Sequence, residues 1–160
     1  FIKKNGEFTL NVGLVQAGQP LLGVVAAPAI DTFWWGTMGH GATLRTGGEV
    51  LPIEARAVPA AGPVAMVSRR HGSPDEEAFL AAEGTAERLA AGSSLKFCRI
   101  AEGVADLYPR FGRTMEWDTC AAHAVLRAAG GRVTTRDGAP LAYGKPDFAN
   151  DDGFIARGRG

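Results

Sequence analysis

Apolar and polar residues alternate near the start of the chain, and this pattern predicts a β-strand with two different faces. The alternation runs from Phe8 to Val15 with the sequence FTLNVGLV, and a period of two residues is that of a strand. Residues 21–28 predict a second strand, and residues 32–46 predict two more around a glycine-rich turn. Four short strands in succession indicate an antiparallel meander, which argues against a purely doubly wound fold at this end.

The sequence after residue 53 changes character. Residues 54–63, EARAVPAAGP, have the composition of a linker or crossover, and residues 64–68 predict a short apolar strand. Ser73 as N-cap, Pro74 at the first helical position and Glu76 three residues after the cap together predict a helix that begins with a capping box. We therefore expect strands and helices to alternate in this part of the chain.

The last third of the chain continues the alternation. Ser93 or Ser94 predicts the start of a helix that closes at Gly103. Residues 104–112 predict a strand leading into a loop, and residues 132–144 predict a strand, an Asp-Gly turn and a second short strand. We interpret residues 1–58 as the remainder of a sheet domain and residues 59–160 as an α/β nucleotide-binding domain.

Composition excludes several classes of protein. Lys plus Arg and Asp plus Glu are both 17, so a large nucleic acid is not an expected partner. The longest apolar run, residues 20–30, is too short and too rich in Gly and Pro to cross a bilayer. Cys98 and Cys120 lie in apolar helical patterns without zinc-site spacing, so we expect buried free thiols in the reducing cytoplasm.

One candidate binding cluster lies at the predicted helix start. It consists of Gly92, Ser93, Ser94 and Lys96. Free N–H groups and the positive end of a helix dipole suit a phosphate there, and Lys96 adds a full charge. The alternative interpretation is simple capping of the helix by a serine.

Two further candidates follow predicted strands. The segment from Ser68 to His71 contains two arginines and a histidine that can grip an anion, although solvated basic loops are common. Arg110 follows a proline, and Tyr108 beside it offers an aromatic face for a base or a sugar. The alternative for this pair is ordinary packing.

Asp118 precedes a run of small apolar residues whose 3.6-residue period predicts a packed helix ending at residues 130–131. One interpretation is that Asp118 is an N-cap. The other is that its carboxylate holds a metal ion or faces a phosphate. Magnesium needs several oxygen ligands, and the sequence has no second acidic cluster at motif spacing, since Glu7, Asp31 and Glu116 are scattered. A single Asp is insufficient.

Three sequence blocks occur together and in order: NGEFTLNVGLV at residues 5–15, GSSLKFCRIAEGVADLYPRFG at 92–112 and MEWDTCAAHAVLRAAGG at 115–131. With these blocks the chain resembles the inositol monophosphatase superfamily, and most closely its CysQ-type 3′(2′),5′-bisphosphate nucleotidases. The resemblance covers nearly the whole chain. It implies a layered αβαβα sandwich, of which this chain is the C-terminal portion.

The resemblance also implies roles for single residues. Asp118 is expected to be a catalytic residue that binds Mg²⁺, with the helix after it directing its N-terminus at the substrate phosphate. The residues expected to bind the substrate are Ser68, His71, Gly92, Ser93, Ser94, Lys96 and Arg110.

This chain departs from the family pattern in two respects. Cys120 and Ala122 stand where the family commonly has Ala and Gly, and a methyl group at Ala122 is expected to hinder close approach of backbone to phosphate. The acidic motif that supplies further metal ligands in the family would lie ahead of Phe1, so we expect this chain to be a part of such an enzyme.

The activity that the resemblance implies is magnesium-dependent hydrolysis of 3′-phosphoadenosine 5′-phosphate, a by-product of sulfate assimilation, to AMP and phosphate. One alternative is the same chemistry on inositol phosphates. Another, from a different class, is a non-catalytic nucleotide-binding fragment. The expected partners are a small bisphosphate nucleotide and either a second copy of the chain or a missing N-terminal half.

Overall fold

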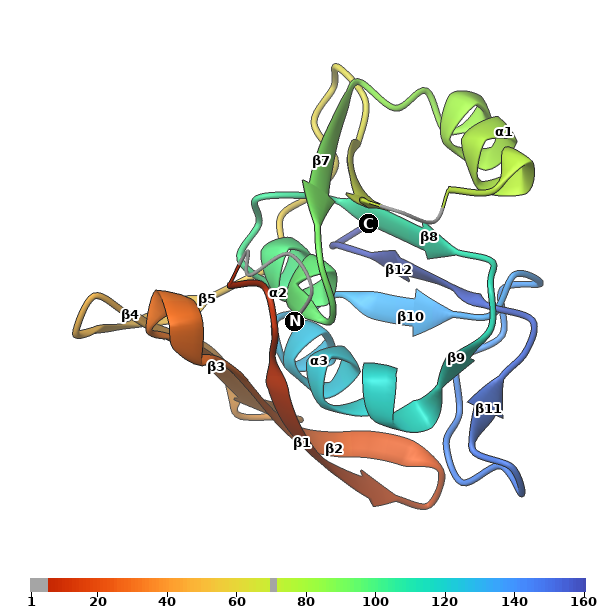
Figure 1. The fold of residues 1–160 in the computed structure, drawn as a ribbon. Coiled ribbons are helices and arrows are strands. Elements are labelled where there is room, and N and C mark those ends of the chain that lie inside the picture. The colour runs from red at the N-terminus through yellow and green to blue at the C-terminus, as the bar shows by residue number, and fades with distance from the viewer. Residues whose placement is uncertain (1–5, 70–71) are drawn as a thin grey trace.

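A computed structural model describes residues 6–69 and 72–160 and arranges them in four layers. One five-stranded sheet is followed by helices α2 and α3, then by a second five-stranded sheet, and then by helix α1 (Figure 1). The expected mixed α/β fold with layered sheets and helices is therefore confirmed.

The first sheet is an antiparallel meander in which neighbours in sequence are neighbours in space. Its strands are β1 (Leu10–Gln16), β2 (Gln19–Ala27), β3 (Thr32–Thr37), β4 (Gly41–Thr46) and β5 (Glu49–Ile53). A short 3₁₀ turn, η1 (Pro28–Ile30), separates β2 from β3. The meander predicted from the alternating pattern is confirmed, and β5 extends it by one strand.

The second sheet has the order β10-β12-β8-β6-β7, and β9 and β11 form a separate pair. The strands are β6 (Val64–Ser68), β7 (Glu87–Ala91), β8 (Leu107–Arg110), β9 (Thr114–Met115), β10 (Arg132–Thr134), β11 (Ala149–Asn150) and β12 (Phe154–Arg157). Strand β6 runs parallel to both β7 and β8. The carboxyl ends of these three strands therefore lie at the same edge of the sheet.

The three helices confirm the local start signals to different degrees. Helix α1 (Pro74–Ala82) begins with the predicted capping box between Ser73 and Glu76. Helix α2 (Leu95–Ala101) has only seven residues, and Ser94 precedes it without a side-chain capping bond. Helix α3 (Glu116–Ala128) ends as predicted before the two glycines, and the small residues of its apolar face are buried.

Helix α3 lies against bare backbone of the first sheet. Gly13 pairs with Gly23 across β1 and β2, and Gly23 pairs with Gly36 of β3, so the three glycines form a row. A β-carbon on Gly23 would stand 1.9 Å from the carbonyl oxygen of Ala121, and one on Gly13 would stand 2.7 Å from Sγ of Cys120. The absence of side chains in this row sets how closely α3 approaches the sheet.

Because Gly13 faces α3, the apolar residues beside it in β1 point the other way. Leu10, Val12 and Leu14 are more than half exposed. Among the described residues no helix packs on this outer face of the first sheet, as Figure 1 shows.

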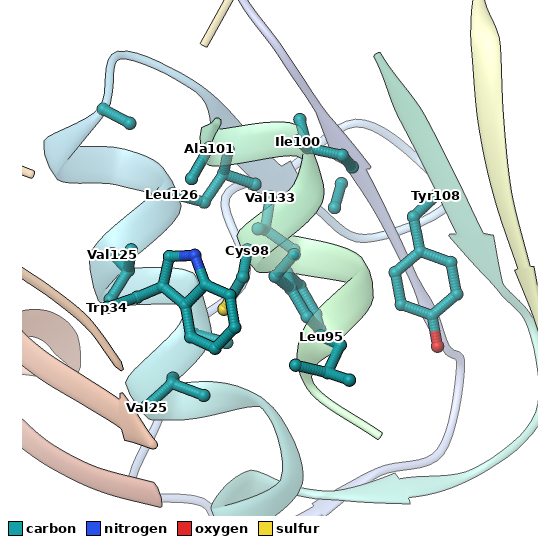
Figure 2. Packing of buried hydrophobic residues seen from close by; sticks show 14 of the residues in the cluster. Val25, Trp34, Leu95, Cys98, Ile100, Ala101, Tyr108, Val125, Leu126 and Val133 are labelled. Atoms are coloured by element: carbon teal, nitrogen blue, oxygen red, sulfur yellow. The ribbon is translucent and has the colours of Figure 1, made fainter. Parts of the chain in front are cut away.

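The main apolar cluster lies between the two sheets. Figure 2 shows Val25 and Trp34 of the first sheet packed against α2 and α3, with Tyr108 of the second sheet on the far side of α2. The cluster contains residues from both sides of residue 58, and the division into residues 1–58 and 59–160 stays a prediction.

Two further expectations concern the cysteines and membranes. Cys98 and Cys120 are free and buried, as expected. Within residues 6–69 and 72–160, no helix has the length and apolar character needed to span a membrane.

Candidate functional site

The predicted binding residues gather at the carboxyl ends of the parallel strands. Ser68 ends β6 and pairs with Ala91, the last residue of β7, so it lies beside Gly92. Arg110 ends β8, the other strand parallel to β6. Crevices outside this edge of an open α/β sheet are where such folds bind ligands.

A polar network holds the loop from Gly92 to Ser94. The hydroxyl of Thr9 lies 2.8 Å from Oγ of Ser93 and 2.8 Å from Oγ of Ser94. Ser94 donates to the side-chain oxygen of Asn11 at 2.8 Å, and Asn11 donates back to Thr9 at 3.0 Å. Ser93 has a φ of +50°, a conformation that is uncommon outside glycine and that clusters at functional sites.

The capping interpretation of this loop is therefore not what the structure shows. Neither Ser93 nor Ser94 caps α2, because both side chains bond across to the entry of β1. The loop is fixed by contacts between residues more than 80 positions apart. Thr9 and Asn11 were missed as site residues; the sequence signal was two polar side chains at the start of a strand within one of the resembling blocks.

Glu7 joins the same cluster through a bidentate ion pair. Its two carboxylate oxygens accept from Nη2 of Arg69 at 2.5 Å and from Nε at 3.0 Å. The hydrogen bonds from Arg69 hold the pKa of Glu7 below its usual value, and a bond from the backbone of Gly92 acts in the same direction. The pair ties the strand leading into β1 to the segment after β6.

Lys96 is a buried cation at the centre of the cluster, with 4% of its surface exposed. Its ammonium group donates to the carbonyl oxygens of Ser93 at 2.9 Å and Ala91 at 3.3 Å, and it lies 4.8 Å from the centre of the Tyr108 ring. Burial, together with the positive charge of Arg110, lowers the pKa of Lys96 to about 8. A phosphate brought to this place would stabilise the charged form.

Tyr108 links these groups electrostatically. Burial raises its pKa, a hydrogen bond with Ser68 opposes that shift, and the charges of Arg110, Glu76 and Asp118 are all close enough to contribute. Three of the predicted binding residues, Ser68, Lys96 and Arg110, therefore interact with one aromatic residue. The prediction for His71 lies outside the described residues.

Asp118 lies in the first turn of α3, three residues after the N-cap Met115. One of its carboxylate oxygens accepts from the backbone N–H of Met115 at 3.0 Å, and the residue is exposed. It is therefore the acid of a capping box rather than the N-cap itself. The other carboxylate oxygen is available to a cation or to solvent.

Glu116 fixes the first turn of α3 to the loop before β11. Its buried carboxylate accepts from the backbone N–H groups of Gly144 at 2.8 Å and Lys145 at 3.0 Å, and from the Lys145 ammonium at 3.3 Å. Burial alone would raise the pKa of Glu116, but these hydrogen bonds outweigh it and lower the pKa. In the sequence Glu116 is one of several scattered acids, but in the structure it anchors the helix that carries Asp118.

The substitution at Ala122 does not place a methyl group in the site. Ala122 is 1% exposed and belongs to the apolar cluster between the sheets. Its side chain therefore packs in the core, and the expected hindrance to a phosphate is not supported.

The described residues do not complete a magnesium site. Residues 6–69 and 72–160 contain no group of three or more His, Cys, Asp or Glu side chains that could hold a metal ion. Asp118 suits one ligand position of a hard cation, but Mg²⁺ demands near-octahedral oxygen coordination.

Comparison with known proteins identifies the class to which this fold and site belong. The model of the inositol monophosphatase family matches residues 1–157, and the chain belongs to that family.

Within the family, the chain is similar to the 3′(2′),5′-bisphosphate nucleotidases CysQ. It is 42% identical over 154 residues to the protein of Shigella flexneri, covering 96% of this chain and 61% of that protein. It is 41% identical over 159 residues to the protein of Buchnera aphidicola, covering 98% of this chain and 59% of that protein. The chain thus spans about three-fifths of the length of these relatives.

A solved structure agrees with this placement. The crystal structure of CysQ from Bacteroides thetaiotaomicron, described as a bacterial member of the inositol monophosphatase family, has a TM-score of 0.90 and 36% identity to this chain. The match covers 100% of this chain and 66% of that structure.

Proposed function

We propose that this chain is part of a magnesium-dependent 3′(2′),5′-bisphosphate nucleotidase that releases phosphate from 3′-phosphoadenosine 5′-phosphate. The identity to the CysQ proteins over almost the whole chain is the observation that carries the proposal. The proposal includes a cytoplasmic location and a role in removing this by-product of sulfate assimilation.

In the proposed complex, Lys96, Arg110 and Asp118 have different roles in binding a nucleotide with two phosphates. Lys96 and Arg110 are two neighbouring cations, and their charges repel each other unless an anion lies between them. A dianionic phosphate in contact with both would offset that repulsion. Asp118 lies close enough to Tyr108 in the same cluster for its negative charge to act on that residue. Asp118 is therefore suited to bind a metal cation that is also bound by the second phosphate.

Mg²⁺ would supply an activated water and a polarised phosphoryl oxygen. Asp118 would give it one carboxylate oxygen, and the substrate phosphate another ligand. The proposed site needs further ligands, and polypeptide corresponding to the additional length of the relatives would supply them.

The two alternatives are separated by features of the same cluster. An inositol phosphatase needs one phosphate site beside a neutral ring, whereas the chain brings two cations and the aromatic ring of Tyr108 together. A non-catalytic nucleotide-binding fragment is favoured by the incomplete set of metal ligands among residues 6–69 and 72–160, and it predicts binding without hydrolysis.

The test is phosphate release from 3′-phosphoadenosine 5′-phosphate and from inositol 1-phosphate, with Mg²⁺ or with EDTA. It compares this chain with a longer version that includes the polypeptide corresponding to the rest of the relatives. We expect Mg²⁺-dependent release from the nucleotide in the longer version only.

The matched variants in the longer version are Asp118→Asn and Asp152→Asn, which both remove one exposed carboxylate. We expect the first to lower phosphate release by on the order of 100-fold or more, because an interaction with a metal at the reacting phosphate is lost, and the second to have no effect. Equal activity of the two variants would refute the role of Asp118. Nucleotide binding without hydrolysis in the longer version would favour the non-catalytic alternative.

A further inference from the structure

Glu76 connects two segments that lead into the candidate site. One carboxylate oxygen accepts from the backbone N–H of Phe111 at 2.8 Å, and the other accepts from the backbone N–H of Ser73 at 3.3 Å. Ser73 follows the segment that contains Arg69, and Phe111 follows Arg110 directly. The side chain is 6% exposed, so both bonds are shielded from water.

We propose that Glu76 is a positioning residue for substrate binding, which holds the Arg110–Phe111 loop and the entry to α1 at a fixed separation. This inference rests on the proposed nucleotidase function, because it assigns a role to Glu76 only through the substrate contacts of the two segments. Its role in the capping box of α1 is confirmed. The bond to Phe111 is not needed for capping, since α1 is complete without it.

The chemistry of the contact requires a carboxylate of this length. Two N–H donors from different segments point at two acceptor oxygens, and only an ionised carboxylate offers two acceptors and no donor. A glutamine in the same position would place its NH₂ group against one of the backbone N–H groups. An aspartate would keep both acceptors but is one methylene shorter, so it can cap α1 but cannot reach Phe111.

The loop after β8 is tightly held on its other sides, so Glu76 supplies a final constraint rather than the only one. A β-carbon on Gly153 would stand 2.2 Å from the carbonyl oxygen of Arg110, and one on Gly112 would stand 3.2 Å from the Arg110 guanidinium. The rings of Phe79 and Phe111 meet edge to face with centroids 5.4 Å apart. With Glu76 in place, the backbone at Arg110 has contacts from α1, from its own loop and from the turn before β12.

The distribution of charge supports the same placement. The carboxylate of Glu76 lies close enough to Lys96 to act on its pKa, in the direction opposite to that of Arg110. Glu76 thus partly offsets the repulsion between the two cations to which we assign the anionic substrate.

The experiment measures the affinity of this chain, residues 1–160, for 3′-phosphoadenosine 5′-phosphate. The method is calorimetry in EDTA, so that no metal is involved. The variants are Glu76→Gln and Glu76→Asp, and the matched control is Glu77→Gln. Glu77 lies in the same helical turn but is exposed and pairs with Arg88. We expect both Glu76 variants to bind about tenfold more weakly, as the loss of one buried hydrogen bond predicts, and the control to bind as the parent does.

A double-mutant cycle separates positioning from general destabilisation. If Glu76 acts through Arg110, then Arg110→Gln and the double variant Glu76→Gln with Arg110→Gln will bind with the same affinity, because the two effects are not additive. Additive losses would overturn the proposal. In the longer version with Mg²⁺, we expect KM to rise while kcat changes less than about twofold, because binding rather than chemistry is affected.

The possible failures are distinguishable. If the parent chain does not bind the nucleotide in EDTA, the same variants are compared by their KM in the longer version with Mg²⁺, and the proposed function fails if that version releases no phosphate from the nucleotide. If the parent binds and both Glu76 variants bind equally well, the role of Glu76 is refuted while the function stands. If Glu76→Gln does not fold, Glu76→Asp decides the question, because it retains the charge and the cap of α1 and loses only the bond to Phe111.

Discussion

Substitution of Gly23 by alanine tests how the position of α3 is determined. The added β-carbon would stand 1.9 Å from the carbonyl oxygen of Ala121, 2.8 Å from its carbonyl carbon and 2.9 Å from the β-carbon of Ala124. Two of these three atoms belong to the helix backbone, so no side-chain rotation can remove the clash. Helix α3 must move outward by about 1.5 Å to restore an ordinary contact of 3.4 Å.

The expected cost follows from two opposing effects. Overpacking of a dense core typically costs about 1–3 kcal/mol, and a clash with backbone lies at the upper end of this range. Replacing a glycine in a strand interior returns roughly 0.5–1 kcal/mol, because the unfolded chain loses conformational freedom. We therefore expect Gly23→Ala to lower the free energy of unfolding by about 2 kcal/mol.

The assay is urea denaturation followed by circular dichroism, with Gly36→Ala as the matched variant in the same row. A β-carbon on Gly36 would stand 2.7 Å from the side chain of Ala128, and this contact can be relieved. We expect Ala128→Gly to recover part of the stability lost in Gly36→Ala, and Ala124→Gly to recover almost none of that lost in Gly23→Ala. Wild-type stability of Gly23→Ala would refute the argument, because the sheet and the helix would then not be in backbone contact.

Three further predictions concern ionisable residues. Glu116→Gln should lower the free energy of unfolding by about 2 kcal/mol in urea denaturation, because a buried carboxylate with three donors is lost. The control Glu49→Gln, on an exposed strand, should have no effect, and equal effects of the two variants would contradict the anchoring role of Glu116. Because the pKa of Lys96 is lowered to about 8, nucleotide affinity measured by calorimetry should fall as the pH rises through that value. Lys96→Met should remove this pH dependence, and the same dependence of affinity on pH in the variant would exclude Lys96 from the anion site. Burial lowers the pKa of His123 from 6.5 to about 3, so the unfolded chain binds a proton that the folded chain does not. The free energy of unfolding should therefore fall as the pH drops below 6.5. His123→Gln should reduce this pH dependence in urea denaturation, and an equally steep dependence in the variant would show that other groups cause it.

The elements that could be predicted from sequence are those whose signals are local. The capping box of α1 lies within four consecutive residues, Ser73 to Glu76, and the structure contains it. The apolar face of α3 repeats within 13 residues and ends at two glycines. Alternation in β1 was sufficient to predict a strand, but not which face is buried, because the glycine face rather than the apolar face meets α3.

Strand β7 could not be predicted from its own residues. Its sequence, ERLAA, has no clear alternation, and it is an edge strand that forms through its parallel pairing with β6. Parallel pairing is determined by the crossover through α1, which is a property of the whole segment. Similarly, β12 is mostly buried and too short to show a period.

In the candidate site too, some features follow from local sequence signals and others depend on tertiary contacts. Local sequence patterns pointed to Ser68, Gly92–Ser94, Lys96 and Arg110, and the structure brings these positions to one sheet edge. The partners that hold them were not predictable in this way, because Thr9 meets Ser93 across 84 positions and Glu76 meets Phe111 across 35. Contacts between residues so far apart in the sequence depend on the complete topology of the fold, and no sequence motif with a fixed spacing predicts them.

The exposure of β1 has a consequence for local opening of the structure. All seven of its residues are exposed, and it is an edge strand paired only with β2 in its sheet. Segments with little buried apolar surface open at a low free-energy cost and exchange their amide hydrogens first. Since Thr9 and Glu7, at the entry to β1, hold Ser93 and Arg69, fraying of this strand would also release the loop that carries Ser93. Amide protection in β1 would then increase when a ligand binds at the Ser93 loop.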